Sequence, residues 1–320
     1  MSSSRLLIVD GHAYAYRAFY AIRNLRSPAG QPTNAIYGFI KMLAKMRVRV
    51  QPTHTIVVWD GGLSAVRQAA LPEYKAQRPE MPADLGLQLD AIGRYLAAAK
   101  VASFCGAGIE ADDYIACLTR AARQAWSVAG LTGWEVVIAS ADKDFMQLVA
   151  PGVGLLNPND KSESVWTAAQ VRAKTGVEPE QIVDWLSLVG DSVDNIPGVP
   201  GVGPKTATEL LQQFGSVAEM YRRLAEVKSA RIRAALQSAV AEVRRNQQLV
   251  RLQDDLECPF APAELVEQPG DPQRLAELYD EWGFRSLRAE LIASLGKAGT
   301  KLAVGGGVGV AESTQQADLF

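Results

Sequence analysis

The chain of 320 residues is poor in histidine and cysteine, and this limits the chemistry it can perform. Only His12 and His54 are present, which argues against a histidine-rich zinc site and a Ser-His-Asp nucleophile. The three cysteines, Cys105, Cys117 and Cys258, are odd in number and match no C-x-x-C spacing. We therefore expect reduced core thiols and a cytoplasmic protein. Any metal must be held by carboxylates, which favours Mg²⁺ or Mn²⁺.

Long hydrophobic runs and an excess of positive charge are also missing. No apolar run approaches the roughly 18 residues that span a bilayer, so no membrane partner is expected. The first ten residues lack a small-residue cleavage site and predict a strand, not a signal peptide. The net charge of −2 counts against DNA binding at first sight. Nine acids are assigned below to one pocket, however, and without them the net charge of the remaining residues is +7. A phosphate-binding face is therefore not excluded.

Short apolar runs rich in β-branched residues predict buried parallel strands at residues 6–9, 55–59 and 135–139. Helical patterns at 35–48 and 85–98 lie between them. Alternating strands and helices predict an α/β fold, a doubly wound and mostly parallel sheet.

From about residue 181 the pattern is helical, and a Gly/Pro-rich segment at 196–205 separates two helix-like runs, 182–188 and 206–214. Six glycines between 296 and 309 predict a flexible linker. Further helices are expected at 217–225 and 229–251, with an amphipathic pair at 273–295. The expected division is a core at 1–180, a helical region at 181–295, and a linker and tail at 296–320.

Acidic residues follow each predicted strand, at the sheet edge where α/β proteins bind ligands. Taken singly, each acid has a structural explanation, as a helix N-cap or as a favourable charge in a first helical turn. Together, four or more converging carboxylates would repel one another unless cations neutralise them. Two divalent ions about 4 Å apart suit phosphodiester hydrolysis, one activating a water and the other offsetting charge on the leaving oxygen. The acids are Asp10, Asp60, Glu110, Asp112, Asp113, Asp142, Asp144, Asp191 and Asp194.

Six segments resemble, in order, the motifs of the flap endonuclease family, and most closely the 5′-nuclease domain of bacterial DNA polymerase I. The order holds from residue 5 to about 295, and no acid of the pattern is missing. The segments are Asp10-Gly-His-Ala-Tyr-Ala-Tyr-Arg-Ala, Trp59-Asp60-Gly-Gly, Tyr74-Lys75-Ala-Gln-Arg78-Pro, Glu110-Ala-Asp112-Asp113, Ala141-Asp142-Lys-Asp144 and Gly190-Asp191-Ser-Val-Asp194-Asn195-Ile-Pro-Gly198.

This resemblance implies a PIN-like core and a 5′-3′ exonuclease or flap endonuclease that cuts DNA at single-strand/duplex junctions in replication or repair. It implies two Mg²⁺ or Mn²⁺ ions and a bacterial, nucleoid-associated enzyme. One ion would be held by Asp10, Asp60, Glu110 and Asp112, and the second by Asp142, Asp144 and Asp194. Asp113 and Asp191 would act through water or from a second layer around the ions.

The basic segment after Asp60 is open to two interpretations. A charge run alone is typical of a solvated loop. In the family this region, about 67–100 here, forms a helical arch that admits only a free single-stranded end. The resemblance then implies that Lys75 and Arg78 contact the scissile phosphate, that Tyr74 stacks on a base and that Arg67 binds DNA.

The glycine-rich segment at 198–206 does not fit a P-loop, because Pro204 separates Gly203 from Lys205 and a helix precedes it. We interpret it as a helix-hairpin-helix element in which Gly201, Gly203, Lys205 and Thr206 meet duplex phosphates without reading sequence. The resemblance adds a K⁺ ion held by hairpin carbonyls.

Expected partners are branched, flapped or nicked DNA and RNA primers on DNA. No polymerase domain follows, so a separate DNA polymerase and ligase are expected as well. Gln316-Ala-Asp-Leu-Phe320 resembles the pentapeptide that binds the sliding clamp, with Gln316, Leu319 and Phe320 matching and Ala317 departing from it. The alternative is an unstructured terminus without a role. The competing functions are an RNA-directed PIN-like nuclease and a non-catalytic junction-binding scaffold.

Overall fold

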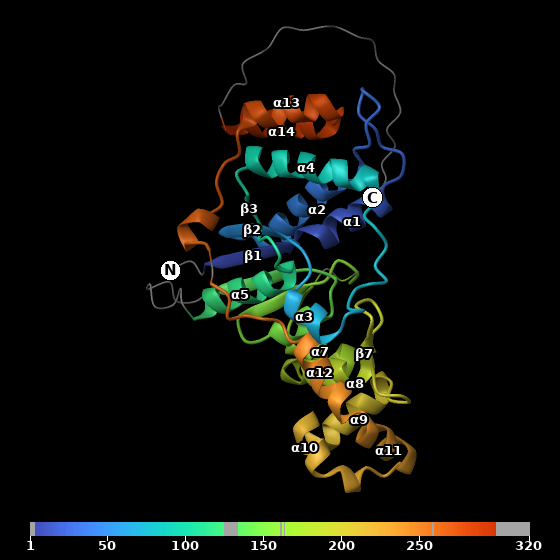
Figure 1. Cartoon of the computed structure of the whole chain (residues 1–320). Helices are drawn as coiled ribbons and strands as arrows, with labels where there is room; N and C mark the ends of the chain where they lie inside the picture. Colours follow the sequence, from blue (N-terminus) through green and yellow to red (C-terminus); the bar gives the residue numbers. More distant parts are fainter. Residues whose placement is uncertain (1–3, 125–133, 161, 163, 258, 299–320) are drawn as a thin grey trace.

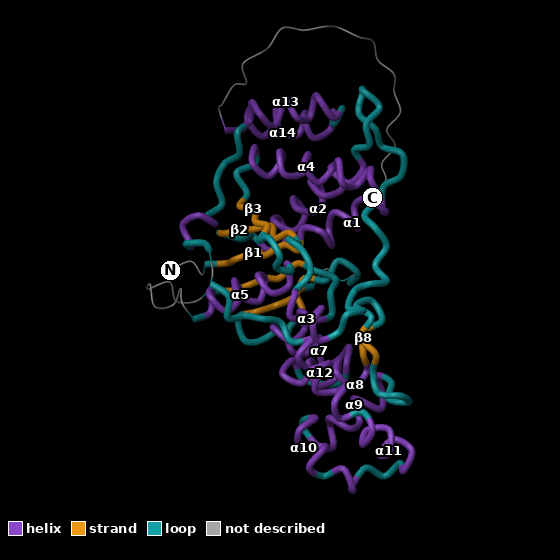
Figure 2. The backbone as a smooth tube through the Cα atoms, in the orientation of Figure 1, coloured by secondary structure: helices purple, strands orange, loops and turns teal. Residues whose placement is uncertain are grey.

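The computed structural model describes residues 4–124, 134–160, 162, 164–257 and 259–298. At its centre is a six-stranded sheet in the order β3-β2-β1-β4-β5-β6. Figures 1 and 2 show β3, β2 and β1 of this sheet side by side. The first five strands are parallel and β6 is antiparallel. The predicted doubly wound sheet is therefore confirmed. The strands are β1 (Arg5–Asp10), β2 (His54–Trp59), β3 (Ala102–Cys105), β4 (Glu135–Ala139), β5 (Val153–Leu156) and β6 (Val165–Trp166).

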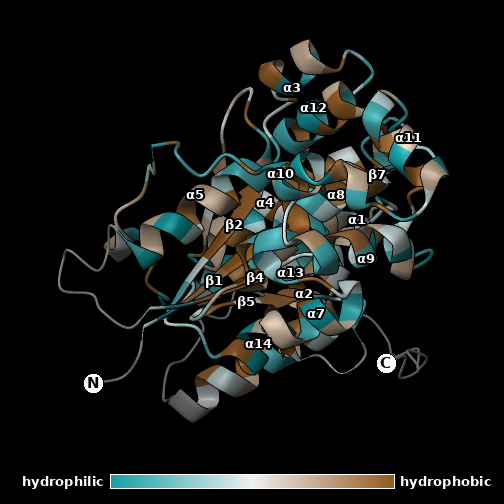
Figure 3. Cartoon of the chain, turned by 90° about the horizontal axis from the view of Figure 1, so that it is seen from below, coloured by the Kyte–Doolittle hydropathy of each residue, from teal (hydrophilic) through white to brown (hydrophobic). Residues whose placement is uncertain are grey.

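The central strands are hydrophobic throughout because both faces of the sheet are covered. Leu6 and Ile8 belong to one core cluster, Leu7 and Val9 belong to the other, and all four are 0% exposed. Figure 3 shows these strands as hydrophobic ribbons, while helices at the surface carry hydrophilic stretches. Each strand residue thus contributes to one of two cores, which fixes the register of the sheet.

One face of the sheet is covered by α1 (Gly11–Ala21), α2 (Asn34–Val50) and α4 (Ala83–Ala98). The last two described helices, α13 (Pro272–Trp282) and α14 (Arg285–Ala298), pack beyond α4, as Figure 1 shows. Sequence patterns grouped these two helices with the region from 181, whereas their core contacts are with the α/β part. Helix α14 also continues past Gly296, where the linker was expected to begin, and ends at Ala298.

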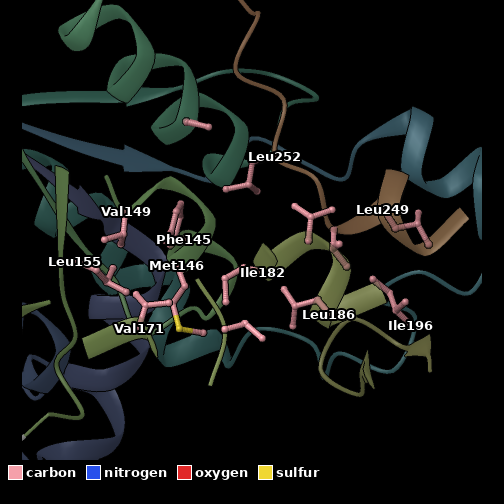
Figure 4. Packing of buried hydrophobic residues seen from close by; sticks show 14 of the residues in the cluster. Phe145, Met146, Val149, Leu155, Val171, Ile182, Leu186, Ile196, Leu249 and Leu252 are labelled. Carbon is pink, nitrogen blue, oxygen red and sulfur yellow. The ribbon is translucent and has the colours of Figure 1, made fainter. Parts of the chain in front are cut away.

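The other face is covered by α5 (Ala111–Arg123), the short helix η1 (Asp144–Leu148) and α7 (Ala168–Thr175), and from there the helical part extends. Figure 4 shows buried side chains running from Phe145 through Ile182 and Leu186 to Leu249. One continuous core therefore joins the helical part to the sheet. The helical part consists of α8 (Ile182–Val189), α9 (Pro204–Phe214), α10 (Val217–Arg222), α11 (Ala230–Ser238) and α12 (Val240–Val250).

The helix predicted at 229–251 is interrupted at Ala239, so α11 and α12 are separate. The backbone of Ala239 is not helical, with φ −100° and ψ 18°, and its side chain is buried. Leu236 of α11 and Val243 of α12 belong to the same core. None of the helices in the described part of the chain combines the length and apolar character that a bilayer-spanning helix requires.

The topology fixes where a ligand can bind. Strand β1 lies between β2 and β4, so the chain first builds the sheet to one side of β1 and later to the other. The connections diverge at this point, and in open α/β sheets the crevice at the carboxyl ends of such strands is the usual binding site. Asp10 ends β1, Asp60 follows β2, and Asp142 comes shortly after β4.

Candidate active site

The acids at the ends of β1, β2 and β4 lie at one edge of the sheet, as expected. Asp10 is the N-cap of α1 through a bond from the Ala13 N–H (3.1 Å), and its other oxygen accepts from Ser140 Oγ (2.8 Å). Asp60 accepts from the Ala111 N–H at the start of α5 (2.9 Å). Asp10 therefore caps a helix and also belongs to the pocket. Burial, together with Asp142 and Asp60, raises the pKa of Asp10 to about 6.

A second acidic group lies beside the first. One carboxylate oxygen each from Asp144, Asp191 and Asp194 lies within 4.8 Å of the others, and all three residues are buried. Asp144 Oδ1 is buried and has no hydrogen-bond partner in the described part of the chain. A buried carboxylate oxygen without a partner is costly unless a cation binds it. The oxygen donors and this unpaired atom fit a hard divalent cation.

Mutual repulsion extends across both groups. Burial, Asp142 and the carboxylates of Asp10 and Asp60 hold the pKa of Asp112 well above its ordinary value. Burial, Asp142, Asp191 and Asp194 do the same for Asp144, and the pKa of Asp142 is also raised. Three cationic side chains form ion pairs with these acids: Lys75, Arg78 and Lys143. Binding of a cation would therefore relieve the repulsion among the carboxylates of this pocket.

Lys75 is buried inside this acidic pocket. Its Nζ lies 2.6 Å from Glu110 Oε2, 3.9 Å from Asp194 Oδ2 and 4.0 Å from Asp112 Oδ2. Burial alone would lower the pKa of Lys75, but Asp112, Asp194 and Glu110 outweigh it and raise this pKa. Burial would raise the pKa of Glu110, and Lys75 reverses that shift. Both groups are therefore charged at neutral pH.

The Tyr74 ring is only 3% exposed, so the proposed stacking on a base requires the segment to move. Its hydroxyl donates to Glu110 Oε2 (3.1 Å). Arg78 is at the rim: its side chain is 39% exposed and donates to Asp194 Oδ1 at 2.7 Å. Lys143, which sequence reasoning did not single out, lies 3.0 Å from Asp191 Oδ1 at the same rim. Lysine and arginine at the mouth of the pocket suit contact with a phosphate.

Arg67 does not occupy the place expected of it, and its partner is Asp113. Arg67 is 5% exposed, and its guanidinium binds both oxygens of Asp113, at 2.7 and 2.8 Å. It also donates to the carbonyls of Leu249 (2.9 Å) and Arg251 (3.1 Å) at the end of α12. In this structure Arg67 is therefore closed to DNA, and both oxygens of Asp113 are taken. The pair instead ties the acidic pocket to the helical part.

Two residues that the sequence analysis missed hold the acids in place. The Ser140 hydroxyl donates a hydrogen bond to Asp10, and its oxygen accepts a hydrogen bond from the Asp142 N–H at 3.1 Å. His12 Nδ1 accepts the Asp60 N–H at 3.1 Å. The Ser-Ala-Asp sequence directly after β4 carried the first signal, because a serine two residues before an acid can bond its backbone. The sequence carries no signal that pairs His12 with Asp60, which lies 48 residues further along the chain.

The glycine-rich segment forms a hairpin between α8 and α9, as predicted. Gly201 has φ +80°, a conformation that side chains rarely adopt, and Gly203 is the N-cap of α9 with Pro204 in its first turn. Gly201, Gly203 and Lys205 are exposed, while Val199 and Val202 are buried in the core. The hairpin therefore presents its backbone to solvent from a rigid base.

The fold and the pocket together define a class of protein. A parallel α/β sheet that gathers carboxylates from several segments at its carboxyl edge fits a metal-dependent nuclease that hydrolyses phosphodiester bonds. Residues 5–176 match the profile of the 5′-3′ exonuclease N-terminal resolvase-like domain, and residues 177–273 match the 5′-3′ exonuclease C-terminal SAM fold. The chain belongs to the 5′-3′ exonuclease family, as its motifs indicated.

Two proteins of similar sequence illustrate this membership. The 5′-3′ exonuclease of Aquifex aeolicus is 36% identical and covers 89% of this chain and 94% of its own length. The DNA polymerase I of Bacillus caldotenax is 35% identical over 88% of this chain, but the chain spans only 32% of that protein.

Solved structures confirm the fold. The bacteriophage T5 5′-exonuclease with bound zinc superposes with a TM-score of 0.62 at 21% identity, covering 92% of this chain and 98% of that one. The catalytic core of Rad2 in complex with DNA substrate has a TM-score of 0.60 at 16% identity, covering 92% and 93%.

We predict that Arg67→Ala lowers the free energy of unfolding by about 3–5 kcal/mol, because it leaves the buried Asp113 carboxylate unpaired. Urea denaturation measures this change. Arg222→Ala is the matched control, since that side chain is 76% exposed beside Glu219 and its loss costs at most about 1 kcal/mol. A loss at Arg67 no larger than at Arg222 would contradict the structural role of the Arg67–Asp113 pair.

We also predict that Asp144→Asn stabilises the chelator-treated protein. The raised pKa of Asp144 makes its ionisation costly in the folded state; this cost is absent below the unfolded-state pKa near 3.8 and grows as pH rises through the folded-state pKa. The melting temperature of the variant should exceed wild type at pH 8 and match it near pH 4. Asp90→Asn, at an exposed position of α4, should give no such gain. A lower melting temperature for Asp144→Asn at pH 8 would refute the repulsion.

Proposed function

We propose that this chain is a divalent-metal-dependent, structure-specific nuclease that hydrolyses DNA at single-strand/duplex junctions from the 5′ side. The observation that carries the proposal is the acidic pocket, with a buried Asp144 oxygen that has no protein partner among the described residues. Residues up to about 180 would carry the catalysis, and the helices from 181 would hold duplex DNA. The 5′-3′ exonuclease family supplies the reaction class.

The ligands fall into two groups. Asp10, Asp60, Glu110 and Asp112 would hold one Mg²⁺ or Mn²⁺, and Asp142, Asp144 and Asp194 would hold the other. The close approach of Asp191 to Asp144 and Asp194 supports adding Asp191 to the second group as a direct ligand. Such ions supply an activated water and charge stabilisation on the leaving oxygen. Among solved relatives, the T5 5′-exonuclease binds zinc, and the T5 flap endonuclease was solved with DNA and metal ions.

The protein's own cations would act on the phosphate. Lys75 and Arg78 belong to one short segment at the pocket, and both are paired with its acids. Each would donate to non-bridging oxygens and offset the charge that develops during cleavage. Arg78 is already partly exposed at the rim, whereas Lys75 must first leave Glu110.

Duplex DNA would contact the exposed hairpin. Backbone N–H groups around Gly201 and Gly203, with Lys205 and Thr206 at the start of α9, suit sequence-independent phosphate binding. Arg231 extends this surface, because its guanidinium lies beside Gly201. A Cβ atom built on Gly201 would be 3.4 Å from the nearest guanidinium nitrogen. Hairpin carbonyls would hold a K⁺ ion that the phosphate shares. An arch within 67–100 would then select free 5′ ends, although α4 itself packs in the core.

We predict that Asp142→Ala abolishes cleavage of a labelled 5′ flap while junction binding persists, because the variant loses a metal ligand and keeps the hairpin surface. Single-turnover cleavage with Mg²⁺ and a binding titration without Mg²⁺ measure the two effects. Asp90→Asn serves as the control that changes a surface carboxylate only. Wild-type cleavage by Asp142→Ala would remove the proposed mechanism.

A sliding clamp, a DNA polymerase and a ligase are proposed partners, since a nuclease that removes RNA primers or flaps leaves a gap or nick. The proposed clamp contact is Gln316-Ala-Asp-Leu-Phe320, which lies outside the described residues and rests on the sequence match alone. A segment of about 18 residues would span roughly 25 Å as a random coil, enough to reach a neighbour on the same DNA.

We predict that purified clamp binds the full chain more tightly than a version ending at Thr314, because Leu319 and Phe320 need an apolar pocket on a partner. Surface plasmon resonance with immobilised clamp compares the two. Equal affinity, or no binding by either, would leave Gln316–Phe320 without this role.

A further inference from the structure

Lys75 occupies a central position among the carboxylates, and this has a consequence for metal binding. Its ammonium lies within 4.0 Å of oxygens from Glu110, Asp112 and Asp194, and its side chain is only 2% exposed. Glu110 and Asp112 come from the start of α5, whereas Asp194 follows β7 (Gly190–Asp191). The ammonium therefore bridges both ligand groups proposed above.

A buried ammonium and a divalent cation cannot both be placed here without cost. Mg²⁺ binds carboxylate oxygens at about 2.0–2.1 Å, and Lys75 already engages Glu110 Oε2 at 2.6 Å. Two cations held a few ångströms apart in a poorly solvated pocket repel each other strongly. Divalent cations must therefore compete with Lys75 for the same carboxylates.

The segment that carries Lys75 is held down by the loop that carries Asp194. The Lys75 N–H donates to the Asp194 carbonyl (3.0 Å), and Asn195 Nδ2 donates to the Glu73 carbonyl (2.8 Å). Arg78 binds the Asp194 carboxylate. Lys75 itself has φ +56°, an uncommon backbone conformation for a lysine. A movement of residues 73–78 that withdraws the ammonium from the pocket would disturb these contacts with residues 194–195.

We propose that Lys75 is a tethered counter-ion that holds the place of a divalent cation, so that metal loading and release of residues 73–78 are coupled. The inference rests on the proposed metal-dependent function. With few divalent ions, Lys75 keeps the acidic pocket charge-balanced. When ions bind, Lys75 is displaced and becomes free to turn toward a phosphate at the mouth of the pocket.

Manganese binding without DNA tests this directly, because it needs no cleavage. Isothermal titration calorimetry with Mn²⁺ should show that Lys75→Met binds at least one ion at least about tenfold more tightly than wild type. Lys143→Met makes the same charge change at the exposed rim and should shift the affinity much less. Lys41→Met, on the distant surface beside Glu290, should not shift it.

Two further readouts separate a counter-ion from a catalytic group alone. In chelator the melting temperature of Lys75→Met should fall below wild type, and saturating Mn²⁺ should remove the difference. If this variant fails to fold, Asn195→Gly removes the bond to Glu73 while tolerating the positive φ of Asn195. It should bind Mn²⁺ several-fold more tightly than wild type with all charges intact.

The outcomes are distinct. Unchanged Mn²⁺ affinity in Lys75→Met, or an equal shift in Lys41→Met, would overturn the counter-ion role and leave the proposed nuclease intact. Unchanged affinity in a folded Asn195→Gly would overturn the coupling to residues 73–78. Absence of Mn²⁺ binding by every variant and by wild type would overturn the proposed metal-dependent function, and with it this inference.

Discussion

Mutual repulsion among buried carboxylates is the constraint on which the rest of this structure depends. Parallel strands place Asp10, Asp60 and Asp142 at one edge of the sheet, and two other segments bring further acids to the same place. Such a cluster destabilises the folded chain unless positive charge enters it. Lys75 inside the pocket and Arg78 at its rim supply part of that charge from the chain itself, and the divalent cations of the proposed reaction would supply the rest.

The same constraint joins catalysis to DNA binding. A hydrophobic core runs without interruption from the sheet to α8 and α12, and the Arg67–Asp113 pair ties the end of α12 to the start of α5. The hairpin around Gly201 is therefore held in a fixed relation to the acids. A duplex anchored on the hairpin would present its junction to the pocket at a set distance, and the proposed enzyme would then select by structure instead of by base sequence.

Most of the fold and the family followed from the sequence, because short continuous apolar runs that each end in an acid are typical of buried parallel strands leading to a polar edge. The two-residue strand β6 and the four-residue strands β3 and β5 were too short to give a periodic signal. The DNA-binding role expected of Arg67 was wrong, because a buried arginine and an exposed DNA-binding arginine leave the same mark in a sequence. Burial alone separates them, and burial depends on α12, far along the chain. The metal-binding roles of the acids stay predictions.

The central claim is that this pocket holds two divalent cations side by side. Crystals grown with Mn²⁺ and measured at the manganese absorption edge test it most directly, since anomalous difference density distinguishes manganese from water and from lighter ions. The proposed two-metal mechanism predicts two peaks about 3.5–4 Å apart, one beside Asp112 and one beside Asp144. A pocket without manganese density, or with one peak at full occupancy and no second site, would contradict it.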